Sequence, residues 1–416
     1  MFHVDADRAD STVPRHVLIS GASIAGPALA HQLAARGWRS TVLERAPRRR
    51  EEGHNIDVRG AAREVARRMG IEDDIRAANT REVGMRFVDD DGSAVASFPM
   101  AAAGQFDGPT AELEILRGEL SRILYEHTCG STDYRFSTQI IELTDHGDRV
   151  TATLDDGTAI DADLVVIAEG LRSRTRDLVL PLDVTELGMY IAYFTIARRD
   201  SDDRWWNWQH VPGSRAVHLR PDNLGTTRAM LTFLSDVRGL EDLDRADQVA
   251  ILRRTFADVG GAAPRILAEL DDAPLYFEAV GQVRSPRWSR GRIALLGDAA
   301  FCASPVGGGS ASLALIGAYI LAGELSRTDD YRAALARYEE FMRPHVDNAQ
   351  DVSPRVLRRA NPRTAAGIRT LHAGARVVAS RAGRAATDLI GRRLVTVAAD
   401  DVALPDYRRT LTATQE

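Results

Sequence analysis

RIALLGDAA at residues 292–300, followed by SPVGGG at 304–309, sets the architecture expected of this chain. An apolar run of strand length ends on Gly297-Asp298, turns through proline and glycine, and enters an apolar helix-like run over 310–325. Glycines let the backbone approach a planar or charged ligand, and a helix that starts there directs free N–H groups toward it. Asp298 can accept hydrogen bonds from ligand hydroxyls. Alone, the dipeptide also fits an ordinary turn after a buried strand.

A second motif of this kind, in which a strand ends at a glycine turn that leads into a helix, lies near the start of the chain. Residues 16–21 read as a buried strand, GASIAG at 21–26 as a glycine turn, 27–36 as a helix and 40–45 as a second strand that carries Glu44. This βαβ order places an acid about 20 residues beyond the turn, where it can bind a ribose hydroxyl. The middle glycine of the usual fingerprint is replaced by Ser23, so its backbone approaches a pyrophosphate only if the Cβ is tolerated.

A third hydrophobic strand, over 163–168, ends on Glu169-Gly170. The three motifs, in this order and with these separations, resemble the class A flavoprotein monooxygenases, the family of para-hydroxybenzoate hydroxylase. Within that family, the nearest likeness is to the tetracycline-modifying and aromatic-polyketide hydroxylases. The resemblance covers residues 14–350 and implies an FAD cofactor.

The resemblance also implies which residues contact FAD. Arg117 matches the family's flavin-binding arginine in an Ile-x-Arg-x-x-Leu pattern. Asp57 and Arg59 lie on a segment that passes beside the flavin ring in the family, although they could equally pair with each other or with solvent. Glu169 replaces the family's aspartate, so it stays open whether the nicotinamide reductant interacts with this protein in the family's ordinary way. The full set of implied FAD contacts is Gly21, Ser23, Ala25, Gly26, Glu44, Arg45, Asp57, Arg59, Arg117, Glu169, Gly297, Asp298, Pro305, Gly308, Gly309 and Ser310.

The fold expected from these patterns is α/β, with a Rossmann-like FAD-binding domain interleaved with a smaller β-sheet substrate domain and followed by a C-terminal helical appendage. We assign residues 1–13 to a disordered arm. The FAD-binding domain takes 14–78, 109–180 and 282–350, the substrate domain 79–108 and 181–281, and the helical appendage 351–416. A chain of 416 residues with 44% hydrophobic residues can bury cores of this size.

Aromatic residues mark the expected substrate site. Alternation over 189–197 places Tyr193 on one strand face, and Trp206 and Trp208 point to one side of the next strand. These side chains and Phe301 are our candidate substrate contacts, although packing between sheet and helix explains the tryptophans equally well. No general base can be identified. His54, Tyr193 and His210 are weak, unranked candidates for a catalytic role.

Composition excludes several classes of protein. All 53 basic residues are arginines, which excludes a Walker-type phosphate loop and a pyridoxal phosphate Schiff base. The lack of lysine also counts against a flavin halogenase, because a resemblance to that family would call for an active-site lysine. A net charge of −6 argues against nucleic-acid binding. Two cysteines and isolated histidines predict no disulfide framework and no metal site. The absence of a signal peptide and of an apolar run of ~18 residues predicts a cytoplasmic protein that contacts no membrane.

The implied activity is that of an FAD-dependent monooxygenase. In the family, NADH or NADPH reduces FAD, O2 adds to form a flavin C4a-hydroperoxide, and one oxygen atom passes to an aromatic or polycyclic substrate, by hydroxylation or another oxygenation. Two alternatives stay open: a flavin dehydrogenase or reductase on the same fold, and a flavin-binding protein with a non-redox role. The protein is expected to be a monomer or a homodimer.

Overall fold

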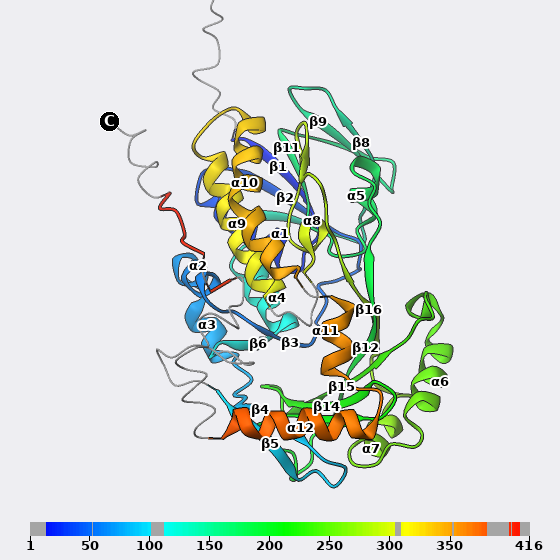
Figure 1. The fold of residues 1–416 in the computed structure, drawn as a ribbon. Helices are drawn as coiled ribbons and strands as arrows, with labels where there is room; N and C mark the ends of the chain where they lie inside the picture. Colours follow the sequence, from blue (N-terminus) through cyan, green and yellow to red (C-terminus); the bar gives the residue numbers. More distant parts are fainter. Residues whose placement is uncertain are drawn as a thin grey trace, which may run out of the picture.

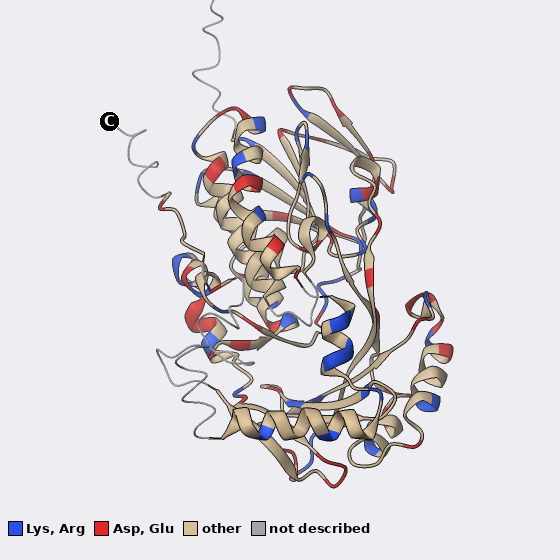
Figure 2. Ribbon diagram, viewed as in Figure 1, with Lys and Arg blue, Asp and Glu red and all other residues tan. Residues whose placement is uncertain are grey.

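A computed structural model describes residues 14–51, 53–100, 112–303, 309–351, 353–380, 399–400 and 402–407. The expected N-terminal arm, over 1–13, lies outside these residues. Two large sheets dominate the fold, and they lie at opposite ends of the molecule (Figure 1). Acidic and basic residues are interspersed over both parts (Figure 2). The α/β class predicted from the sequence is confirmed.

The first sheet contains the three strands whose ends carry the sequence motifs. Its six strands lie in the order β17-β18-β11-β1-β2-β7. These are β17 (Ser289–Arg290), β18 (Ile293–Leu295), β11 (Leu164–Ile167), β1 (His16–Ser20), β2 (Arg39–Glu44) and β7 (Thr132–Phe136). The pairs from β18 to β7 are parallel. Because carboxyl ends of parallel strands share an edge, residues that follow β1, β2, β11 and β18 are brought together.

Apolar helices cover this sheet. The helices α1 (Ala25–Ala34), α9 (Ser310–Leu325) and α10 (Tyr331–Ala349) pack against one another beside it (Figure 1). The helix α9 is almost entirely buried, which explains its nearly uninterrupted apolar sequence. Its bounds agree with the range predicted from the sequence.

The second sheet has seven strands in the order β16-β12-β15-β14-β13-β4-β5. These are β16 (Tyr276–Gln282), β12 (Thr185–Ala197), β15 (Thr226–Leu234), β14 (Arg215–Pro221), β13 (Trp206–Val211), β4 (Gly84–Val88) and β5 (Ala94–Pro99). The early β4-β5 hairpin therefore lies beside strands that come much later in the chain. We propose that the two sheets mark two domains, with the hairpin belonging to the second.

Two helices that the sequence analysis did not anticipate cover one face of this sheet. They are α6 (Arg245–Phe256) and α7 (Ala263–Ala268), and they pack on inward residues of β12 such as Tyr190 and Phe194. The alternation along β12 therefore leaves Ile191 and Tyr193 on the opposite face, as predicted.

The remaining elements are smaller. A two-stranded ladder is formed by β3 (Asn55–Asp57) and β6 (Glu114–Leu116), and a three-stranded sheet by β8 (Ile140–Asp145), β9 (Val150–Leu154) and β10 (Ala159–Ala162). The remaining helices are α2 (Ala61–Met69), α3 (Glu72–Ala77), α4 (Arg117–Glu126), α5 (Arg174–Val179), α8 (Asp298–Phe301) and the short 3₁₀ turn η1 (Leu240–Asp242).

The C-terminal helices pack on the second sheet. The helix α11 (Pro354–Ala360) lies against β12, and α12 (Ala365–Ala379) runs across β5 and β13 (Figure 1). Ala375 of α12 is buried with Met85 and Phe87 of β4. The segment expected to be a helical appendage therefore contributes an apolar face to the core.

Candidate functional site

Two cavities adjoin between the sheets. The strand-end cavity, about 410 Å³, lies at the carboxyl ends of β1, β2 and β11 and at the start of α8. The sheet cavity, about 590 Å³, lies against β12, β13, β14 and β15. Four side chains line both cavities: Arg50, His54, Arg117 and Tyr276. The two cavities therefore meet at these residues, and a ligand in one can contact a ligand in the other.

The β1–α1 turn forms one wall of the strand-end cavity. Gly21 has a φ of +117°, and a Cβ at this position would lie 2.4 Å from the carbonyl oxygen of Ala168, so only glycine lets β1 and β11 end side by side. A Cβ on Gly26 would lie 2.0 Å from the carbonyl oxygen of Gly21. Gly26 thus serves the packing of α1 beneath the turn. Ser23 and Ala25 line the cavity at the N-terminal end of α1.

Ser23 is held by an arginine from another element. Arg117, the first residue of α4, donates from Nη1 to Ser23 Oγ at 2.9 Å. The residue that departs from the glycine fingerprint therefore supplies an acceptor for the arginine implied to contact FAD. Glu44 also braces the turn, because its carboxylate accepts the backbone N–H groups of Ala22 at 3.2 Å and Ala46 at 2.9 Å. Glu44 and Arg45 both line the cavity.

Asp298 and the start of α9 form the opposite wall. Asp298 lines the strand-end cavity, and burial raises the pKa of its carboxyl group while the positive charge of Arg117 opposes that shift. Ser310, the first residue of α9, lines the same cavity directly after Gly309, whose φ is +95°. Gly297 caps α8 immediately before Asp298. Pro305 and Gly308 lie outside the described residues.

Glu169 is engaged by the protein itself. Its carboxylate accepts hydrogen bonds from the hydroxyl groups of Ser20, Ser173 and Thr175 and from the backbone N–H of Thr175. Glu169 also lines the strand-end cavity. The longer acid therefore ties the end of β11 to β1 and to the start of α5.

Three predicted ligand contacts lie elsewhere. Arg59 is 3% exposed and forms a bidentate ion pair with Asp400, with N···O distances of 3.1 and 2.9 Å. The backbone carbonyl of Asp57 accepts a hydrogen bond from Ser312 of α9. Phe301 is 2% exposed and packs on Trp288, with ring centroids 4.7 Å apart. Among the described residues, neither cavity wall includes Asp57, Arg59 or Phe301, so their roles as ligand contacts stay predictions.

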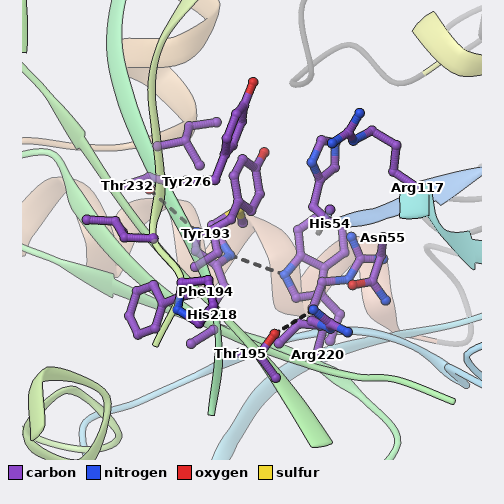
Figure 3. A pocket seen from close by; sticks show the side chains of 18 of the residues that line it. His54, Asn55, Arg117, Tyr193, Phe194, Thr195, His218, Arg220, Thr232 and Tyr276 are labelled. Carbon is purple, nitrogen blue, oxygen red and sulfur yellow. Dashed lines mark hydrogen bonds between the residues drawn. The ribbon is translucent and has the colours of Figure 1, made fainter. Parts of the chain in front are cut away.

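Aromatic and polar side chains line the sheet cavity. Trp206 and Trp208 lie nearly parallel, with ring centroids 5.7 Å apart and an interplanar angle of 11°, and both line the cavity. His218 accepts the indole N–H of Trp206 on Nδ1 at 3.1 Å. This contact assigns the His218 proton to Nε2, which faces Thr232 (Figure 3). The wall is therefore a preformed aromatic surface with fixed polar groups.

A buried ionic network lies behind this wall. Arg220 pairs with Glu82 and Glu114, and its guanidinium group lies 4.1 Å from the ring centroid of Trp206. Asn55 donates to Glu114 at 2.7 Å. Burial raises the pKa of Glu82 well above its ordinary value, with Arg220 opposing and Glu114 reinforcing the shift. The network links the β3–β6 ladder to the seven-stranded sheet.

His54 and Tyr193 lie where the cavities meet. Their rings are stacked at 4.4 Å with an interplanar angle of 17° (Figure 3). Burial, together with the charges of Arg117 and Arg220, lowers the pKa of His54 to about 3, so its ring is neutral near pH 7. Within the described chain, no residue hydrogen bonds to His54 Nδ1.

The sequence patterns did not identify Tyr276 and Glu278 as candidate site residues. The hydroxyl of Tyr276 donates to Glu278 at 2.9 Å, and Glu278 lines the strand-end cavity. The face of β16 that they share and the neighbours of that strand were not visible in a local pattern.

His210 lies in the packing of the C-terminal helices. Its Nε2 donates to the carbonyl of Ala360 at 3.1 Å, and its Nδ1 lies 3.2 Å from His372 Nε2. Burial lowers the pKa of His210 to about 3. The walls formed by the described residues do not include His210, so its catalytic role stays a prediction that neither cavity supports.

The described residues form neither a cluster of metal-ligating side chains nor a helix that could cross a membrane. Over these parts of the chain, no group of three or more His, Cys, Asp or Glu side chains is placed to hold a metal ion. No described helix combines the length and apolarity needed to cross a membrane.

Comparisons with known proteins give the family. The model of the FAD binding domain matches residues 15–353. A flavin-dependent monooxygenase, eupH of Phoma sp, is 37% identical over 388 residues, covering 85% of this chain and 90% of its own.

Solved structures agree. The tetracycline destructase Tet(51) is 28% identical with a TM-score of 0.77 and covers 96% of this chain and 100% of its own. Tet(55) is 33% identical with a TM-score of 0.74 and covers 89% and 97%. The chain therefore belongs to the class A flavin-dependent monooxygenase family and carries that family's FAD-binding domain.

Proposed function

We propose that the strand-end cavity holds FAD through the residues gathered at the strand ends. The N-terminal ends of α1 and α9 both face this cavity, and such ends favour negatively charged groups. Arg117 adds a fixed positive charge beside Ser23, and Glu44 is placed to accept from ribose hydroxyls. The donor set fits a dinucleotide with a charged pyrophosphate. Bound FAD would supply the electron transfer and oxygen activation that no side chain provides.

We propose that the substrate is a planar aromatic compound that carries at least one hydroxyl group. The observation that carries this proposal is the junction of the cavities, where the sheet cavity, walled by Trp206, Trp208 and Tyr193, opens onto the FAD-binding site. A cavity of about 590 Å³ lies within the range of sites for drug-sized ligands. The likeness to Tet(51) and Tet(55) favours a polycyclic phenol, so tetracycline is the first compound to test.

The walls would position such a compound and exclude water. Stacking on the aromatic wall would fix the plane of the rings. His54 is neutral and holds a nitrogen without a described partner, so it would bind a substrate hydroxyl as a hydrogen-bond partner. Burial and the positive charges of Arg117 and Arg220 make His54 a poor proton acceptor.

NADH or NADPH is the proposed reductant. The absorption spectrum of the FAD-loaded protein, recorded anaerobically with each nicotinamide in turn and then in air, tests this assignment. The flavin absorbance should bleach with one of them, faster when tetracycline is present, and return in air. Flavin that neither nicotinamide reduces, with or without aromatic compounds, would overturn it.

A further inference from the structure

A phenol and a carboxylate on β16 extend from one cavity to the other. Tyr276 lines both cavities, and Glu278 lines the strand-end cavity. The two residues alternate along the strand, so their side chains leave the same face, and Tyr276 donates its hydroxyl proton to Glu278 Oε2 at 2.9 Å. A continuous hydrogen-bonded path therefore leads from the edge of the sheet cavity to a carboxylate beside the FAD-binding site.

An aromatic row from β12 lies beside this phenol. The ring of Tyr193 lies 6.3 Å from that of Tyr276, and Tyr193 stacks in turn on His54. Figure 3 shows the rings of Tyr193 and Tyr276 side by side at the edge of the sheet cavity. A hydroxyl of an aromatic ligand bound along this row would lie next to that of Tyr276.

The electrostatic surroundings suit Glu278 for accepting a proton. Burial raises the pKa of Glu278, and Asp298 reinforces that shift, whereas the bond from Tyr276 and the charges of Arg117 and Arg172 oppose it. A carboxylate with a raised pKa is a stronger base than an exposed one. Burial also raises the pKa of Tyr276, with Glu278 reinforcing the shift, so its phenol keeps a proton to donate. His54 is disfavoured in this role by its lowered pKa.

We propose that Tyr276 and Glu278 carry the proton of a substrate hydroxyl out of the sheet cavity. The substrate O–H bond breaks as an O–H bond forms on Tyr276 Oη, and the proton that Tyr276 held passes to Glu278 Oε2. The negative charge of the carboxylate is thereby replaced by that of the substrate oxyanion, which makes the aromatic ring more electron-rich. This inference rests on the proposed function, because it requires a hydroxylated aromatic substrate.

Variants of the FAD-loaded enzyme test the proposal. The rate of tetracycline oxygenation in a single turnover is measured against pH for Tyr276→Phe, Glu278→Gln and the double variant. Each single variant should be slower by about 10²–10⁴-fold and lose the rise in rate that follows ionisation of Glu278. The double variant should be no slower than the slower single variant, because both act in one path. A wild-type rate and pH profile in Tyr276→Phe would overturn the proposal.

Tyr190→Phe is the matched control, because Tyr190 lies on the neighbouring β12 and its hydroxyl bonds to the carbonyl of Val237. Its rate should stay within about twofold of wild type, as expected for a change away from the site. A wild-type enzyme that oxygenates neither tetracycline nor other phenols would instead refute the proposed function. The carboxyl infrared band of Glu278 tests the assignment of the base separately from that function.

The pKa read from that band should lie above the ordinary glutamate range in the resting FAD-loaded enzyme. It should shift in Tyr276→Phe and disappear in Glu278→Gln. If no band titrates there, Glu278 is not the proposed base.

Discussion

Arg117 Nη1 and Ser23 Oγ are joined by a hydrogen bond of 2.9 Å, which connects the first turn of α4 to the turn between β1 and α1. Ser23 occupies the position where the dinucleotide fingerprint usually has a glycine. Serine adds a polar contact at a position where the main requirement is usually that the backbone approaches the pyrophosphate closely. Because Arg117 also lines both cavities, Ser23 helps to hold an arginine at their junction.

Ser23→Ala should therefore weaken FAD binding. Loss of one hydrogen bond to a charged group predicts a dissociation constant about tenfold higher, equivalent to ~1.4 kcal/mol. Titration of the apoprotein with FAD, followed by flavin fluorescence, measures this constant. Ser23→Gly is the comparison, since it loses the same bond but restores close backbone approach. An unchanged dissociation constant for FAD in Ser23→Ala would show that FAD binding does not depend on the hydrogen bond between Ser23 and Arg117.

Asp298→Ala should lose most bound FAD. Asp298 is a half-buried acid that lines the strand-end cavity, and alanine removes the acceptor that we assign to cofactor hydroxyls. The ratio of flavin absorbance to protein absorbance after purification measures the loss. Asp148→Ala, in an exposed turn, serves as the control. A folded Asp298→Ala protein with wild-type FAD content would remove Asp298 from the binding set.

Glu169→Ala should destabilise the fold by about 3 kcal/mol. The change leaves three hydroxyl groups and one backbone N–H without their common acceptor. Urea denaturation of the apoprotein measures the free energy of unfolding without the contribution of FAD. If that energy is unchanged while reduction by NADH or NADPH is lost, Glu169 acts in the reductive step and not in the fold.

Arg220→Met should destabilise the protein by about 3–5 kcal/mol near pH 7, because it leaves Glu82 and Glu114 buried without their counter-charge. The pKa of Glu82 is raised in the folded state, so folding takes up protons and stability falls as pH rises from the ordinary glutamate pKa to the raised one. The variant should lose more stability over this interval than the wild type. Urea denaturation at a series of pH values would detect the difference, and parallel curves would refute it.

Acid should loosen the packing of α12. Burial lowers the pKa of His210 to about 3 and also lowers that of His372. The unfolded state therefore binds protons first, and stability is lost as pH falls below the ordinary histidine pKa of about 6.5. Hydrogen exchange of α12 amides should accelerate over this range. His372→Phe should reduce the acceleration, and an unaltered pH dependence in that variant would assign it to other groups.

The sequence predicted best the features that depend on the order of residues within one short segment. The strand, glycine turn and acid recur within short segments, and parallel pairing brings their ends together, so the α/β fold and the walls of the strand-end cavity followed from the pattern. The range of α9 was predicted for the same reason, because its apolar run starts after a glycine turn.

Contacts between distant segments could not be predicted. Arg59 and Asp400 are 341 positions apart, and His210 and His372 are 162 apart, so nothing near either residue signals its partner. Phe301 lies three positions after Asp298 in sequence, yet the short α8 turns its ring into the core. Tyr276 and Glu278 gain their placement only from the edge position of β16 in the seven-stranded sheet.

The fate of labelled oxygen tests the central claim most directly. The FAD-loaded enzyme is supplied with ¹⁸O₂, tetracycline and whichever of NADH or NADPH reduces the flavin, and the product is analysed by mass spectrometry. A monooxygenase inserts one labelled oxygen atom into each product molecule, and this is the result that we predict. An oxidised product that carries no label from O2 would contradict the assignment and identify the protein as a flavin dehydrogenase.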